Sequence, residues 1–295
     1  MPTYVISISG PTASGKTTLS RLLLRIFDGL TFTPRTRTTS TPISISTTIL
    51  HQDDFYFPET EIPIKCVPKE DTPGEYEEQR DWDCPEAIDF GKLKCCLKKF
   101  RDEGCAGPED HARILDELGI KAIEAENSVG PERVSQGEVN EIRGRILDEL
   151  ENSTELGNSA RRVHILILEG FLLYFNETPH TKELSPLLSL LDARLLLHTT
   201  LTHAVSRRKN RMTYVTVEGF FEDPPGYIEN VVWPNYVNYH RHLFVDGDVE
   251  KGELSDWAQT VAGIKRQERE GMEMRELVEW GAKVIVQALG QAQSG

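Results

Sequence analysis

The chain has 295 residues, of which 33 are Lys or Arg and 47 are Asp or Glu, so its formal net charge is −14. Hydrophobic residues make up 38% of it, which is ordinary for a globular protein with a full core. The acidic balance argues against a nucleic-acid-binding protein, which would carry a basic face. No apolar run reaches the roughly 20 residues that cross a bilayer, and Met1 opens no signal-peptide pattern. We therefore expect a cytoplasmic protein with neither a membrane nor a nucleic acid as partner.

The first third of the chain alternates strand and helix patterns. Residues 4–9 are rich in β-branched side chains and predict a buried strand, and residues 10–16 predict a glycine-bearing loop. Leu19, Leu22, Leu23 and Ile26 form the apolar face of a helix that follows. Residues 31–48 are rich in Thr and Ser and predict a mostly loop-like insertion, although residues 43–46 alternate like a strand. Residues 49–51 predict the end of a strand.

The middle of the chain is less regular. Residues 59–73 contain several prolines and predict a loop. A helix is expected to begin near Trp82, with Asp83 as its N-cap and Pro85 in its first turn. Residues 102–161 are acidic and predict a peripheral, partly ordered insertion. Two short helical patterns lie within it, formed by Ile114, Leu115 and Leu118 and by Ile142, Ile146, Leu147 and Leu150.

The second half of the chain returns to alternating elements. Residues 163–168 are almost continuously apolar, as expected of a central parallel strand, and residues 193–199 predict another. Further expectations are a basic helix over 202–211, a Gly/Pro-rich loop over 213–227, a helix from Trp233, a last strand over 243–245 and helix over 254–289. This order predicts an α/β fold with a parallel sheet flanked by helices, in a single domain spanning 1–295.

The clearest motif follows the first strand and fits G-x-x-x-x-G-K-[ST]. Glycines let the backbone curl around phosphate oxygens, and the N-terminus of the next helix adds positive potential. Lys16 is placed to reach the β- and γ-phosphates and the Thr17 hydroxyl to coordinate Mg²⁺. We therefore predict a P-loop nucleotide site. Its residues are Gly10, Pro11, Thr12, Ala13, Ser14, Gly15, Lys16, Thr17 and Thr18.

Carboxylates follow two of the predicted strands. Asp53 and Asp54 come after the second strand, beside the phosphate loop at the carboxyl edge of the sheet. A carboxylate there could accept a proton from a substrate hydroxyl, hold Mg²⁺ through water, or be an ordinary cap or loop residue. Glu169 ends the central strand, a position where P-loop proteins place an acidic group near the metal.

Arg207, Arg208 and Arg211 lie on the basic helix at helical spacing. A guanidinium above the transferring phosphoryl group would stabilise the charge of the transition state. The helix and the loop after it, residues 202–227, are predicted to form a mobile lid. The alternative is a solvated basic helix face.

Several segments between residues 3 and 247 together resemble the nicotinamide riboside kinase family, part of the wider uridine kinase-like group of P-loop kinases. They are residues 10–18, Gln52-Asp53-Asp54-Phe55-Tyr56, Trp82-Asp83, residues 167–173, Arg207-Arg208 with Arg211, Pro225-Gly226-Tyr227, and Val232-Trp233-Pro234 with Tyr236. The resemblance implies ATP-dependent phosphorylation of the 5′-hydroxyl of nicotinamide riboside to nicotinamide mononucleotide, with ATP and Mg²⁺ as cofactors.

The resemblance also implies roles for single residues. Asp53 would be the general base, and Arg207 and Arg211 would lie on the ATP side, with Lys16 and Arg208 as further catalytic residues. Thr17, Asp53 and Glu169 would surround Mg²⁺. The implied substrate-binding residues are Asp53, Asp54, Phe55, Tyr56, Trp82, Asp83, Arg208, Thr213 and Tyr214.

The aromatic residues at the implied base site have a physical reason. Nicotinamide riboside carries a pyridinium cation, and an aromatic face attracts a cation by roughly 0.5–2 kcal/mol. We therefore predict that Trp82 and Tyr214 sandwich the base, with Thr213 as the alternative to Tyr214 because the lid sequence permits a one-residue shift. Two other functions remain open at this point: a uridine- or pantothenate-type kinase, and a nucleotide-binding regulatory protein without turnover.

Overall fold

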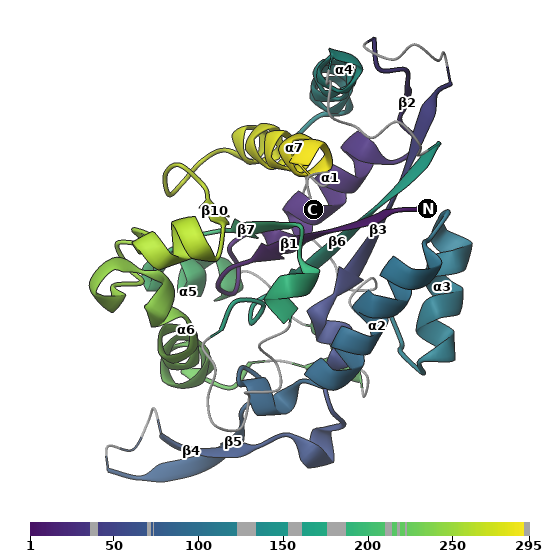
Figure 1. Ribbon diagram of the computed structural model, residues 1–295. Helices are drawn as coiled ribbons and strands as arrows, with labels where there is room; N and C mark the ends of the chain where they lie inside the picture. The colour runs from purple at the N-terminus through teal and green to yellow at the C-terminus, as the bar shows by residue number, and fades with distance from the viewer. Residues whose placement is uncertain are drawn as a thin grey trace.

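The computed structural model describes residues 1–35, 41–69, 72, 74–122, 134–152, 161–175, 187–209, 214–216, 219–221 and 223–291, with the backbone alone at 209, 214–216, 219–221 and 291. Its centre is a six-stranded sheet in the order β10-β7-β1-β6-β3-β2 (Figure 1). Four of the five pairings are parallel, and β2 pairs antiparallel with β3 at one edge. The strands are β1 (Thr3–Ser9), β2 (Thr31–Phe32), β3 (Ile43–His51), β6 (Arg162–Gly170), β7 (Ala193–Leu196) and β10 (Ile264–Arg266). The predicted α/β class is confirmed.

The side chains of β1 alternate between two hydrophobic clusters, one on each face of the sheet. Val5 belongs to the cluster on one face, whereas Tyr4, Ile6 and Ile8 belong to the cluster on the other. All seven residues of β1 are buried, because helices cover both faces. This explains why β6 carries an unbroken apolar run over residues 165–168 and why even the Ser side chains of β1 are buried.

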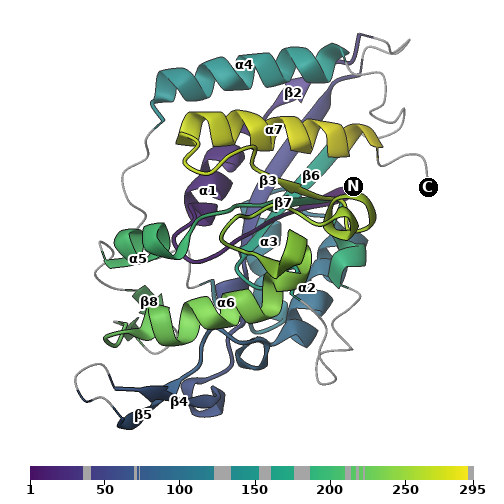
Figure 2. The same cartoon turned by 90° about the vertical axis from the view of Figure 1, so that its left-hand side faces the viewer.

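Three helices, α1 (Lys16–Phe27), α4 (Gln136–Asn152) and α7 (Met274–Gln291), cover one face of the sheet (Figure 1). Helices α2 (Phe90–Glu103) and α3 (Pro108–Glu117) cover the other face. The other α-helices of the described residues are α5 (Leu201–Lys209) and α6 (Trp233–His240) (Figure 2). Within the described ranges, no helix is long and apolar enough to cross a membrane.

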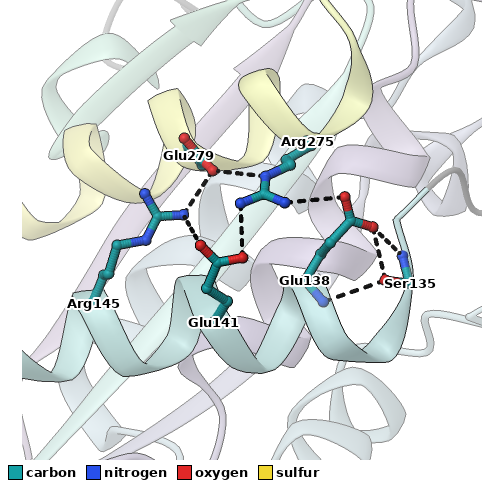
Figure 3. A network of polar contacts seen from close by, with 6 residues as sticks. All are labelled: Ser135, Glu138, Glu141, Arg145, Arg275 and Glu279. Atoms are coloured by element: carbon teal, nitrogen blue, oxygen red, sulfur yellow. Dashed lines mark hydrogen bonds and ion pairs between the residues drawn. The ribbon is translucent and has the colours of Figure 1, made fainter.

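The acidic segment 102–161 contributes to the core. Both helical patterns predicted in it are confirmed, as α3 and α4. Helix α4 lies beside α7 (Figure 2) and buries Val139, Ile142, Ile146 and Leu150. Charged side chains of α4 and α7 also pair across the solvent side of this contact (Figure 3). The described part of the segment is therefore packed rather than peripheral.

The predicted helix start near Trp82 is wrong. Only a short 3₁₀ turn, Pro85–Ala87, forms there, and Asp83 does not cap it. Ile88 then bridges Tyr56 in extended conformation, which prevents a helix from passing through. Helix α2 begins at Phe90, where the Asp89 side chain accepts a hydrogen bond from the Lys92 N–H.

Three segments predicted as loops contain strands. Residues 59–73 contribute β4 (Ile64–Pro68), which forms a hairpin with β5 (Tyr76–Arg80) at the far end of the molecule from α4 (Figures 1 and 2). The loop after α5 contains a small hairpin, β8 (Tyr214–Thr216) with β9 (Gly219–Phe221). Strand β3 begins at residue 43, so its first six residues fall in the segment predicted to be mostly loop.

The predicted last strand, 243–245, is also wrong. Short 3₁₀ turns, Arg241–Leu243 and Val245–Gly247, lie on either side of Phe244, which makes a single bridge to Leu254. The edge strand is β10 instead, inside the segment predicted to be helical. It has three residues, too few to show a periodic pattern, and follows Gly263, whose φ of +62° ends the turn before it.

Candidate active site

The phosphate loop joins β1 to α1, as the motif predicts. Gly10 and Gly15 have φ of +150° and +99°, where side chains are strained, and a Cβ at Gly10 would lie 2.5 Å from the Leu197 carbonyl oxygen. Helix α1 has no acidic side chain in its first turn, so the positive end of its dipole is not neutralised there. The loop is therefore suited to bind an anion.

Lys16 folds back over this loop. Its Nζ donates hydrogen bonds to the carbonyl oxygens of Gly10 and Pro11, at 3.1 and 3.0 Å. The ammonium group thus lies above the backbone that would surround the phosphates, as expected for a residue that reaches the terminal phosphates.

Glu169 is held from two sides at the end of β6. Its Oε1 accepts a hydrogen bond from the Thr17 hydroxyl at 3.0 Å and lies 2.8 Å from Nδ1 of His51. Burial raises the pKa of Glu169, but the hydrogen bond and charge of His51, the charge of Lys16 and the Thr17 hydrogen bond outweigh it and lower the pKa overall. Glu169 is therefore an ionised, oriented carboxylate beside the phosphate loop.

Asp53 lies in the 3₁₀ turn Gln52–Phe55 that follows β3 directly. Burial, followed by the charge of Glu169, raises its pKa to about 7, while Lys16 and His51 act in the opposite direction. Asp53 also lies two residues beyond His51, which faces Glu169 in the register of β3 and β6. Two carboxylates and one ammonium group therefore converge beside the phosphate loop, as the sequence predicts.

A hydroxyl and two carboxylates in one place suit a hard cation. Thr17, Asp53 and Glu169 offer the oxygen ligands that Mg²⁺ takes together with phosphate oxygens and water. Across the described ranges, no group of three or more His, Cys, Asp and Glu side chains is placed to hold a metal ion. A cation here would therefore need the Thr17 hydroxyl and the phosphates of a bound nucleotide to complete its coordination.

Tyr56 connects this region to Asp83. Burial raises its pKa well above the ordinary value, and the charges of Asp53 and Asp83 raise it further, while Arg208 lowers it. Asp83 itself is buried, and its pKa is raised to about 6 by burial, against the lowering effect of the nearby Arg208. Asp53 and Asp83, which are both predicted to bind substrate, thus act on the same tyrosine and belong to one site.

Arg208 is held above the phosphate loop by an acidic partner. Its Nε and Nη2 donate to the two carboxylate oxygens of Asp223, at 2.5 and 2.8 Å, and its Nη1 donates to the Thr12 hydroxyl at 2.6 Å. Arg207 donates to the Ala13 carbonyl oxygen at 3.3 Å. Two of the three predicted arginines therefore reach the loop from α5.

Trp82 lies at the edge of the site. Its ring meets Tyr56 edge to face, with centroids 5.3 Å apart. It also lines a cavity of about 240 Å³, together with Glu59, Glu78, Gln79, Arg80, Pro224 and Tyr227. One of these lining residues, Tyr227, also contacts the Asp83 carboxylate through its hydroxyl.

Other predicted residues have different surroundings. The Phe55 ring lies in the main hydrophobic cluster below the site. Asp54 shares the turn of Asp53 and raises the pKa of that residue slightly. Arg211 and Thr213 lie outside the described residues, as does the Tyr214 side chain, so the second half of the predicted sandwich stays a prediction.

Sequence reasoning missed three residues that orient the site: His51, Asp223 and Tyr227. His51 was predicted only as the end of a strand. Tyr227 ends the Pro-Gly-Tyr motif, to which the sequence assigns no role, and Asp223 precedes that motif. A parallel register that places the ends of two strands side by side could have indicated His51, whose neighbour across the sheet is Glu169.

The chain has relatives among known proteins. No protein-family model matches it. It is 31% identical over 289 residues to nicotinamide riboside kinase of Schizosaccharomyces pombe, covering 97% of this chain and 98% of that protein. Nicotinamide riboside kinase of Saccharomyces cerevisiae is 28% identical, covering 83% and 81% of the two chains, and nicotinamide riboside kinase 2 of Mus musculus is 25% identical, covering 82% and 83%. Because the first similarity spans nearly the whole length of both proteins, the chain belongs to the nicotinamide riboside kinase family.

Proposed function

We propose that the chain transfers the γ-phosphoryl group of ATP to the 5′-hydroxyl of nicotinamide riboside, giving nicotinamide mononucleotide and ADP. The relatives that the chain matches carry the name of this activity. The observation that carries the proposal is the convergence of Asp53, Glu169 and Lys16 at the mouth of the phosphate loop. This arrangement places a carboxylate that can accept a proton, Asp53, beside a site that can bind the phosphates of a nucleotide.

The phosphate loop and the N-terminus of α1 would hold the phosphates of ATP. Lys16 and Arg208, both directed over the loop, would stabilise the charge on the transferring group. Thr17, Asp53 and Glu169 would hold Mg²⁺, which when bound offsets the negative charge of the phosphates. The lowered pKa of Glu169 favours this arrangement, because it keeps that carboxylate ionised.

Asp53 would act as the general base. As the bond between the 5′-oxygen and the γ-phosphorus forms and the bond to the β,γ-bridging oxygen breaks, Asp53 would accept the proton of the hydroxyl. A base is most effective when its pKa lies near the working pH, and burial and Glu169 raise that of Asp53 to about 7. Cleavage of that bond would release ADP, and Asp53 would then pass its proton to solvent to restore the carboxylate.

The riboside would lie between Asp83 and the Trp82 cavity. The Asp83 carboxylate would accept hydrogen bonds from the ribose hydroxyls. The Trp82 face would contact the pyridinium ring, because a cation is attracted to an aromatic face. Tyr214 would complete the sandwich from the lid. Arg208 would lie between riboside and phosphate, since its charge acts on Asp83 as well as on the loop.

The test is substrate-dependent release of ADP with MgATP and nicotinamide riboside, uridine or pantothenate at equal concentrations, with the product identified by chromatography. We expect nicotinamide mononucleotide and a clear preference for nicotinamide riboside. A preference for uridine or pantothenate would replace the proposed substrate. ATP binding without product from any of the three would indicate a regulatory protein without turnover.

A further inference from the structure

The hydroxyl of Tyr227 contacts the segment that carries both riboside-binding residues. It lies 3.2 Å from the backbone nitrogen of Trp82 and 3.2 Å from Oδ2 of Asp83. The carbonyl oxygen of Arg80 is also 3.2 Å away. The hydroxyl can accept the Trp82 N–H and donate its one hydrogen to Asp83 or Arg80.

The chain around Tyr227 is built to fix this hydroxyl. Gly226 has a φ of +70°, and a Cβ there would lie 2.9 Å from the Asn230 side-chain nitrogen. The Tyr227 N–H donates to the carbonyl oxygen of Pro224 at 3.1 Å, which closes the turn before the π-helical turn Ile228–Val232. The ring is 2% exposed, packed in a cluster with Val67, Ile228, Val231 and Val232. The hydroxyl is thus held by a buried ring and a tight turn.

The same short segment also reaches the phosphate side of the site. Asp223 lies four residues before Tyr227 and binds the guanidinium of Arg208, which contacts Thr12 of the phosphate loop. One end of the segment 223–227 therefore orients an arginine at the phosphate loop, and the other end touches Asp83 and Trp82.

We propose that Tyr227 is a positioning residue for riboside recognition. Its hydroxyl holds the Asp83 carboxylate and the Trp82 backbone in the orientation that receives the ribose and the base, and it does not touch the reacting atoms. This inference rests on the proposed function, because it assumes that Asp83 and Trp82 bind the riboside. Without the hydroxyl, the Asp83 carboxylate and the Trp82 N–H each lose the hydrogen bond that the Tyr227 hydroxyl makes with them.

The first test is steady-state kinetics of Tyr227→Phe, which keeps the ring. We expect the KM for nicotinamide riboside to rise on the order of 10-fold, the loss typical of a hydrogen bond to a charged group, while kcat and the KM for ATP change less than about 2-fold. Tyr236→Phe is the matched control. Its hydroxyl is buried and has no hydrogen-bond partner among the residues described, so this variant should leave the KM for the riboside unchanged.

The second test separates positioning from a general structural role. If Tyr227 acts through Asp83, Tyr227→Phe should cost much less in an Asp83→Asn background than in the wild type, which a double-mutant cycle measures. Riboside affinity measured by calorimetry provides the same comparison without turnover. Replacing Tyr227 with 4-aminophenylalanine keeps a hydrogen-bonding group on the ring and should restore the wild-type KM for the riboside. This variant also provides the test if Tyr227→Phe folds poorly.

The outcomes are distinguishable. Wild-type protein that does not phosphorylate nicotinamide riboside contradicts the proposed function. Active wild-type protein with an unchanged KM for the riboside in Tyr227→Phe contradicts the positioning role, as does equal loss in the presence and absence of the Asp83 carboxylate. A fall in kcat with no change in the KM for the riboside would also overturn it.

Discussion

Nδ1 of His51 lies 2.8 Å from Oε1 of Glu169, the oxygen that also accepts the hydrogen bond of Thr17. The two residues face each other in the parallel register of β3 and β6. Their side chains are 7% and 6% exposed, so little water competes with the contact. Glu169 is therefore oriented by the neighbouring strand on one side and by the first turn of α1 on the other.

Removing the His51 donor should weaken the metal site rather than the fold. His51→Leu is expected to raise the Mg²⁺ concentration for half-maximal activity by about 10- to 100-fold, the usual effect of losing a group that orients a metal ligand. His51→Asn is the matched control, because its side-chain nitrogen can occupy the place of Nδ1 and donate to Glu169. The measurement is a Mg²⁺ titration of ADP release at saturating ATP. Equal Mg²⁺ dependence in the Leu variant and the wild type would contradict the role of His51.

Asp53→Ala should lose turnover and keep ATP binding. General base catalysis contributes about 10²- to 10⁴-fold, so riboside-dependent ADP release is expected to fall within that range. Asp54→Ala is the control from the same turn, and we expect it to retain most of the activity. Rapid kinetics and ATP affinity by calorimetry check both variants. A larger loss in Asp54→Ala than in Asp53→Ala would transfer the base role to Asp54.

Trp82 should distinguish a charged base from a neutral one. Trp82→Leu is expected to weaken binding of nicotinamide riboside by roughly 0.5–2 kcal/mol, or about 2- to 30-fold, because the aromatic face over the cation is lost. Binding of the reduced riboside, whose ring is neutral, should weaken less in the same variant. The affinity of Trp82→Phe for nicotinamide riboside should lie between those of the wild type and Trp82→Leu. Affinities for both ribosides provide the comparison. Equal losses for the charged and the neutral riboside would exclude a cation–π contribution.

The strands that could be predicted from the sequence are those that helices cover on both faces. Strands β1 and β6 are covered on both faces, so β1 is rich in buried β-branched residues and β6 carries an unbroken apolar run over residues 165–168. The hairpin of β4 and β5 was missed because it is mostly exposed, with only Val67 and Gln79 buried in its two strands. Strand β10 is held by pairing with β7 rather than by a pattern of its own.

The candidate site also contains residues that a local sequence pattern predicts and residues that only the folded structure brings together. The phosphate loop is a local motif, and Asp53 and Glu169 follow strand ends, so the chain order alone places them at one edge of the sheet. The contacts of His51 with Glu169 and of Tyr227 with Asp83 join residues 118 and 144 positions apart. They depend on the strand register and on the turn at Gly226, which no local pattern predicts.

Acid should destabilise the protein through His164. This side chain is fully buried on β6, and burial, followed by the charge of His111, lowers its pKa to about 3. Because the folded pKa lies below the unfolded value of about 6.5, the unfolded state binds more protons as the pH falls through this window, and stability is lost. The loss attributable to His164 is about 2 kcal/mol at pH 5.

His164→Gln removes this titration. The wild type should therefore lose more stability than His164→Gln between pH 7 and pH 5, as measured by urea denaturation at each pH. The difference between the two proteins is the relevant quantity, because Asp53 and Asp83, whose pKa values are raised, act in the opposite direction in this range. Parallel pH profiles for the two proteins would contradict a buried, neutral His164.

Helix α4 offers a test of whether the acidic segment belongs to the core. Ile146 is 3% exposed in the cluster shared with α1 and α7, so Ile146→Ala should lower the free energy of unfolding by about 2–5 kcal/mol. Arg275 pairs with Glu138, Glu141 and Glu279 on the surface of the same contact (Figure 3), and Arg275→Met should lower the free energy of unfolding much less, because exposed ion pairs contribute little to stability. Urea denaturation of both variants gives the comparison. If Ile146→Ala cost no more than Arg275→Met, α4 would be a dispensable addition to the sheet, because burial of its apolar face is what makes it part of the fold.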